Sequence, residues 1–178
     1  MMHSYKKTAI ILKGRSFIMI VLNLKTKDCM QHLLLKPTFD SFSLIEGEIT
    51  TYNTFHVNGY IHKNFFEEAP SKEYSSWGDL REFCFQIIRG KRTPLSFRFI
   101  LSLPKESFRD FLTKQELSSF RPSDVQGLYL NFKYDGTCLQ CITGISLNIF
   151  TMDKTLENIW DNYAEKFFLT QEIGFEHS

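Results

Sequence analysis

The sequence has no long apolar run and almost no net charge. No stretch approaches the roughly 18 consecutive apolar residues of a membrane-spanning helix, so no membrane association is expected. The 178 residues carry a formal net charge of +1, whereas an extended nucleic-acid groove usually needs a larger excess of Lys and Arg. Nucleic acid is therefore expected as a partner only through a local patch, such as the aromatic and basic row of Tyr129, Asn131 and Lys133.

Catalytic signatures are also absent. The chain contains no Walker loop, no dinucleotide-binding glycine motif, no nucleophile elbow and no zinc-binding HExxH. We therefore expect no cofactor and no metal. The leading hypothesis is a small cytoplasmic protein that binds or interacts without catalysis.

Cysteine is scarce, with only four copies. Cys138 and Cys141 have the spacing of redox and zinc motifs, but those motifs open a helix or sit on a turn. Here the pair lies in an expected strand, where residues three apart point to opposite faces. Cys29 and Cys84 lie in apolar helical stripes, where a thiol acts as a small hydrophobe. Reduced thiols are the expectation.

Phenylalanine is abundant, with 18 copies. Because each buried Phe removes a large apolar area from water, a chain of this length can build one compact core. We expect a single α+β domain over residues 19–169, with a mostly antiparallel sheet and helices packed on one side. Residues 1–18 are expected to be a non-native or disordered extension, and residues 170–178 a frayed tail.

Hydrophobic periodicity predicts the elements of this domain. The expected strands cover residues 20–24, 41–50, 54–61, 95–103, 128–134 and 137–143, the last extended by residues 144–150. The expected helices cover residues 26–36, 77–89, 105–120 and 155–169. Asp135 and Gly136 predict a type I′ turn between the last two strands, and Gly59 predicts a bulge or a close approach.

The helix over residues 77–89 has the clearest boundaries. Ser76 and Asp79 form a capping box at its start, and Gly90 is typical of the residue after a helix end. We expect burial of its apolar stripe and that of the last helix, which comprise Leu80, Phe83, Ile87, Trp160, Tyr163 and Phe167. Truncating Phe83 to Ala would then cost about 3–5 kcal/mol.

Two carboxylates and a histidine form a candidate catalytic group. Glu46 and Glu48 share one side of a strand, and His56 lies on one side of the next. If the two sides coincide, the carboxylates face the imidazole across the strand pair and can perform acid–base chemistry. Polar residues on the wet face of a sheet are the ordinary alternative. This group supports a second hypothesis, an enzyme acting on a phosphorylated or otherwise anionic small molecule.

A basic cluster follows the helix at Gly90. Arg89, Lys91, Arg92 and Thr93 can hold phosphate or another anion. The helix dipole alone also favours cations at this end. The cluster remains the stronger functional candidate, with an anionic ligand or a protein as partner. An enzyme would need a pocket that joins Lys91 or Arg92 to the carboxylates and His56.

Six segments of the sequence form a recognisable set: Thr38-Phe39-Asp40, Ile49 to Phe55, Gly90 to Phe97, Gly127 to Asn131, Thr143-Gly144 and Asp153 to Leu156. Together they resemble a family of uncharacterised bacterial proteins, catalogued as a domain of unknown function and typical of anaerobic Gram-positive gut bacteria. The resemblance extends from about Met19 to Phe168 and implies a cytoplasmic bacterial setting, without any functional residue to transfer.

The first 18 residues also raise the question of where translation starts. The codons of Lys13-Gly14-Arg15 can spell a purine-rich ribosome-binding sequence, and three residues separate them from Met19. A β-branched strand follows Met19 at once. The alternative is a natural N-terminal segment that forms a strand. We predict that translation starts at Met19.

Deleting residues 1–18 should leave the melting temperature unchanged, because these residues were not selected to pack. Thermal unfolding of the full and shortened chains checks this expectation. Intact-mass spectrometry of the protein from its native host provides the second measurement. A mass that includes His3 to Ile18 would refute the start at Met19, and so would a structure in which Ile10, Ile11 and Leu12 pair as a buried strand.

Overall fold

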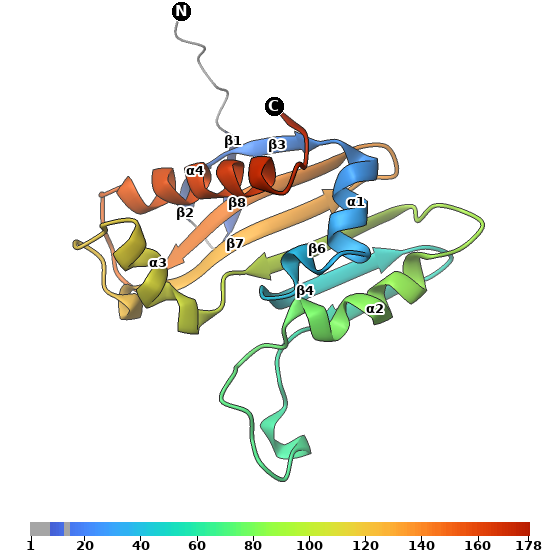
Figure 1. Ribbon diagram of the computed structural model, residues 1–178, viewed down its shortest axis with the longest axis horizontal. Helices are drawn as coiled ribbons and strands as arrows, with labels where there is room; N and C mark the ends of the chain where they lie inside the picture. Colours follow the sequence, from blue (N-terminus) through green and yellow to red (C-terminus); the bar gives the residue numbers. More distant parts are fainter. Residues whose placement is uncertain (1–7, 13–14) are drawn as a thin grey trace, which may run out of the picture.

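The computed structural model describes residues 8–12 and 15–178, with side chains from Ile20 onward. Its main feature is an antiparallel sheet of seven strands in the order β5-β4-β6-β7-β8-β3-β9 (Figure 1). The strands are β3 (Val21–Leu24), β4 (Ser43–Thr50), β5 (Thr54–Asn58), β6 (Ser96–Ser102), β7 (Val125–Tyr134), β8 (Leu139–Leu147) and β9 (Phe175–His177).

Four helices accompany this sheet in the described part of the chain. They are α1 (Thr26–Leu34), α2 (Trp77–Ile88), α3 (Phe108–Lys114) and α4 (Thr155–Thr170), and short 3₁₀ turns cover Pro37–Phe39, Lys63–Phe65, Lys105–Ser107 and Pro122–Asp124. Helices α1, α2 and α4 lie over one face of the sheet, and α3 lies at one end of it (Figure 1). This confirms the predicted α+β fold with an antiparallel sheet.

Alternating residues divide the sheet into a dry and a wet face. In β6, Phe97, Phe99 and Leu101 are buried, whereas Arg98 and Ile100 between them are half-buried. The dry face meets the helices through aromatic contacts. The phenylalanine-rich composition therefore does build one continuous core.

The start of the described chain forms its own hairpin. Strand β1 (Thr8–Leu12) pairs with β2 (Arg15–Met19) in a separate two-stranded sheet, and β2 runs close to β8 and α4. The side chains of residues 8–19, and residues 1–7 and 13–14 entirely, lie outside the described residues. Translation from Met19 therefore stays a prediction.

The C-terminal segment, expected to be frayed, is ordered. Strand β9 pairs with β3 at one edge of the sheet, and the backbone N–H of Lys25 donates to the carbonyl oxygen of Gly174 at 2.8 Å. Ile173 is fully buried. One apolar residue past the helix end thus anchors the tail, and the free edge of β3 supplies backbone partners.

Helix α2 presents a different face to the core than expected. Trp77, Cys84 and Ile88 are buried, while Phe83 is 68% exposed. The Trp77 indole N–H donates to the Leu33 carbonyl at 2.7 Å and sets the rotation of the helix. Leu80 and Ile87 are half-buried at the margin of this face. The expected burial of Phe83 is wrong because the buried Trp77 and Cys84 turn a different side of the helix toward the core.

The aromatic residues of α4 are buried or half-buried, close to the expectation. Trp160 is fully buried, and Tyr163 and Phe167 are half-buried against the core. At the start of α2, the Ser76 hydroxyl donates to the Asp79 carboxylate at 2.5 Å instead of capping the backbone.

Both glycine positions prove to be special. A Cβ on Gly59 would lie 1.8 Å from the Leu44 carbonyl oxygen, which confirms the close approach. Gly136 has a φ of +95°, and no other residue of its loop has a positive φ, so the predicted type I′ turn is wrong. The Asp135 carboxylate instead accepts the backbone N–H groups of Thr137 and Cys138.

Two phenylalanines test the assignment of buried faces. Replacing Phe99 with Ala should lower the free energy of unfolding by about 3–5 kcal/mol, because its ring is fully buried. Phe83→Ala should change it by less than about 0.5 kcal/mol, because its ring is in water. Urea denaturation of both variants measures the difference, and equal losses would contradict this account of α2.

Candidate functional site

The basic cluster lies in a groove at the C-terminal end of α2. The helix ends at Ile88, Arg89 turns into an extended conformation, and the backbone N–H of Leu95 donates to the Thr50 carbonyl at 2.8 Å. The groove has a volume of about 500 Å³, and residues from the β4–β5 turn close its other side. Its lining comprises Thr51, Tyr52, Ile87, Ile88, Arg89, Gly90, Lys91, Arg92, Thr93 and Leu95.

The rim of the groove is positively charged and its remaining surface is largely apolar. Arg89, Lys91 and Arg92 are exposed, and within the described residues their side chains make no hydrogen bond or ion pair. The end of α2 carries only about half a negative charge. Three cations therefore leave a clear positive excess for a ligand.

Two further groups of the groove can contact a ligand. The Tyr52 ring is 87% exposed and offers an open aromatic face. The Thr51 hydroxyl oxygen is buried and has no hydrogen-bond partner within the described part of the chain. A buried hydroxyl without a partner favours a hydrogen bond from outside the chain. Sequence reasoning missed Thr51 and Ile87 as groove residues, because the fold alone brings the turn to the helix.

The carboxylates and His56 do share one face, as the sequence suggested. Glu48 and His56 are direct partners across β4 and β5, with 3.4 Å between the carboxylate Oε2 and the imidazole Nδ1. Glu46 instead accepts a hydrogen bond from Arg98 on β6 at 2.5 Å. All these side chains are substantially exposed, so their ion pairs add little stability.

This group belongs to the wet face of the sheet and is separate from the groove. Its row continues across the sheet from His56 and Glu48 to Arg98 on β6 and Lys133 on β7. None of Glu46, Glu48 and His56 lines the groove with the basic cluster. The arrangement that the enzyme hypothesis requires, a pocket that joins the two groups, is not formed by this groove.

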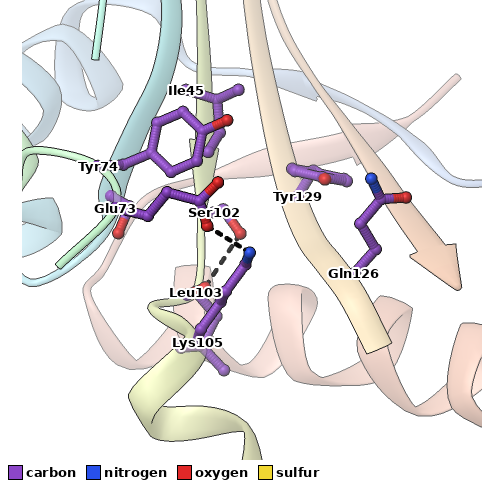
Figure 2. A pocket seen from close by; sticks show the side chains of 9 residues that line it. Ile45, Glu73, Tyr74, Ser102, Leu103, Lys105, Gln126 and Tyr129 are labelled. Atoms are coloured by element: carbon purple, nitrogen blue, oxygen red, sulfur yellow. Dashed lines mark hydrogen bonds and ion pairs between the residues drawn. The ribbon is translucent and has the colours of Figure 1, made fainter. Parts of the chain in front are cut away.

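A second, smaller pocket of about 100 Å³ lies at the edge of the wet face (Figure 2). Tyr74 and Tyr129 line it, and Lys105 donates to Glu73 at 2.5 Å across it. Burial, followed by the nearby Tyr74 and Glu73, raises the pKa of Tyr129. Because Glu73 and Lys105 lie 32 residues apart, no local sequence pattern could associate them.

The room for Tyr129 depends on Gly127. A Cβ at Gly127 would lie 2.1 Å from the Tyr129 hydroxyl oxygen, so the phenol extends over this glycine. The ring of Tyr129, which the sequence suggested as a surface for stacking a base, is half-buried. The pocket beside Tyr129 is too small for a nucleic-acid base, whereas the groove at Arg89 is large enough.

The cysteines show no metal or redox arrangement. Cys29, Cys84 and Cys141 are buried and Cys138 is exposed, and all four are free. Within the described residues, no three His, Cys, Asp or Glu side chains form a group that could hold a metal. Burial raises the pKa of the Cys84 thiol to about 11 and moves those of Cys29 and Cys141 upward as well.

A family model matches residues 32–176 of this chain. The chain belongs to DUF5721, a family of unknown function. The DUF5721 match begins within α1 and reaches β9, so it includes α2, the groove and the wet face. No curated protein and no solved structure matched the chain. No helix among the described residues has the length and apolar character to cross a membrane.

Thiol reactivity tests the cysteine environments. A thiol reagent at pH 8 should label one equivalent in the native protein, at Cys138, because the other three are buried and hold their protons. Four equivalents should react in urea. Rapid labelling of Cys141 in the native state, located by peptide mass, would show that β8 is not packed as described.

Proposed function

We propose that this protein is a non-catalytic binding module whose groove at the end of α2 holds an anionic ligand. The observation that carries the proposal is a set of three exposed cations that have no partner within the described residues and surround an apolar floor. Such a set is unfavourable by self-repulsion, and a bound anion removes that cost.

The chemistry of the lining specifies the kind of ligand. Arg89 and Arg92 can each donate two parallel hydrogen bonds to a phosphate or carboxylate, and Lys91 adds a point charge. Ile87, Leu95 and the open ring of Tyr52 provide apolar contact beside the charges. A ligand with an anionic group and an apolar or aromatic part fits both halves. Nucleic acid fits less well, because its binding usually neutralises more phosphates than three cations can.

The lining also favours binding over turnover. The residues around the groove include no carboxylate, imidazole or thiol, which are the usual groups for acid–base and nucleophilic work. An enzyme acting on an anionic small molecule, with Glu46, Glu48 and His56 as its acid–base groups, would need the ligand to reach the other face of the sheet. The geometry therefore supports a binding protein.

A bacterial cytoplasmic setting is part of the same proposal. It rests on the family resemblance of the sequence and on four cysteines that are all free. Reduced thiols fit a compartment in which disulfides do not persist.

Inorganic pyrophosphate is a suitable probe of the groove. At constant ionic strength it should raise the melting temperature of the wild type, because a ligand that binds only the native state stabilises it. At ten times the dissociation constant the gain is about 1.4 kcal/mol, or roughly 3–6 °C for a chain of this size. The variant Arg89→Gln, Lys91→Gln, Arg92→Gln should show no rise, as measured by differential scanning fluorimetry.

A matched variant controls for net charge. Arg109→Gln, Lys114→Gln, Lys154→Gln removes three exposed cations outside the groove and should respond to pyrophosphate like the wild type. An equal response of the groove variant and the wild type would refute the anion site.

A further inference from the structure

A loop between β5 and α2 projects from the body of the protein (Figure 1). Phe65 at its tip is 86% exposed, and the Phe66 ring contacts it edge to face at 5.4 Å between centroids. Glu67 and Glu68 follow and are exposed. We call residues 63–68 the acidic-aromatic loop. Phe65 and Phe66 therefore do not anchor this segment to the core.

The direction of the acidic-aromatic loop is fixed at its base. The backbone N–H of Ile61 donates to the Glu73 carbonyl at 2.9 Å, and that of Ser75 donates to Gly59 at 2.8 Å. The rings of Tyr60 and Tyr74 meet edge to face just above these bonds. The two sides of the loop are therefore held together where they leave the domain, and the tip is presented outward.

Two adjacent phenylalanines in water are unfavourable for a protein that acts alone. Burial of apolar surface is favourable, and exposed apolar patches of this kind often mark an interaction site. Glu67 and Glu68 make no ion pair within the described residues. The tip thus offers two apolar rings next to two unpaired carboxylates.

The groove at the end of α2 is complementary to this tip in both respects. Its apolar part, Ile87 with Leu95 and Tyr52, suits the phenylalanine rings. Its rim, Arg89, Lys91 and Arg92, suits the two carboxylates. A volume of about 500 Å³ leaves room for side chains of this size.

The two surfaces of one molecule lie too far apart to meet. The segment that carries the acidic-aromatic loop leads into the start of α2. The groove lies at the other end of α2, 12 residues or about 18 Å further along the helix. The loop also extends away from α2 (Figure 1). A groove that receives the tip of this loop therefore belongs to another molecule.

We propose that the acidic-aromatic loop of one copy binds the basic groove of a second copy of this chain. The inference rests on the proposed function, because it uses the same anion-binding groove and names the anionic partner. The contact joins two different surfaces, so it closes a dimer when each copy fills the groove of the other, and otherwise extends into a chain.

Sedimentation velocity over a range of protein concentrations tests this contact. The wild type should shift from monomer toward a larger species, and added salt should weaken the shift because the contact is partly electrostatic. The loop variant Glu67→Lys, Glu68→Lys and the groove variant Arg89→Glu, Lys91→Glu, Arg92→Glu should each weaken association at least about tenfold, or 1.4 kcal/mol.

Mixing the two variants provides the decisive measurement. Each variant alone opposes like charges in every contact, whereas the mixture pairs the reversed loop with the reversed groove and the natural loop with the natural groove. A 1:1 complex should therefore reappear only in the mixture. The control Glu106→Lys, Asp110→Lys reverses two exposed acids elsewhere and should associate like the wild type.

The outcomes separate this inference from the function on which it rests. A loop variant that still binds pyrophosphate but no longer self-associates supports both. A wild type that binds pyrophosphate yet stays monomeric at every concentration overturns the self-association and leaves the anion site standing. A mixture that shows no complex also overturns the inference, and far-UV circular dichroism spectra like that of the wild type establish that the folds of the variants are intact.

Discussion

The burial of Trp77 determines where the two proposed surfaces of this protein lie. Its ring packs against Phe99 of β6 at 4.8 Å between centroids, and its indole N–H is satisfied by the Leu33 carbonyl of α1. The backbone N–H of the same residue donates to Phe42 at 2.7 Å. One residue thus joins the first turn of α2 to the sheet, to α1 and to the segment between them.

The consequences run in both directions along α2. At its start, the Trp77 anchor and the short pairing of residues 59–61 with 73–75 hold the base of the acidic-aromatic loop. At its end, the same helix places Ile87 and Ile88 beside the β4–β5 turn and thereby forms the groove. The rotation that buries Trp77, Cys84 and Ile88 also leaves Phe83 in water. Because a helix is rigid over 12 residues, its two ends cannot be repositioned independently.

The carboxylates of the wet face lie beside basic side chains and so offer a weaker case for function. Glu46 pairs with Arg98, Glu48 with His56, and Lys105 with Glu73. The basic groove differs because its cations have no such partners in the described chain. The contrast shows why charge pairing distinguishes a candidate site better than the presence of catalytic residue types does.

The sequence by itself determined the fold class, most element boundaries and the basic cluster. The strand and helix periodicities and the Gly90 stop are local properties, and Gly59 marked a close approach correctly. It could not determine the face of α2, the ordered tail or the exposure of Phe65 and Phe66. Those depend on long-range contacts: Trp77 with Leu33, β9 with β3, and the loop base at residues 59–61 and 73–75. Only the tertiary structure brings the β4–β5 turn to the end of α2, because a groove between segments far apart in sequence leaves no local pattern.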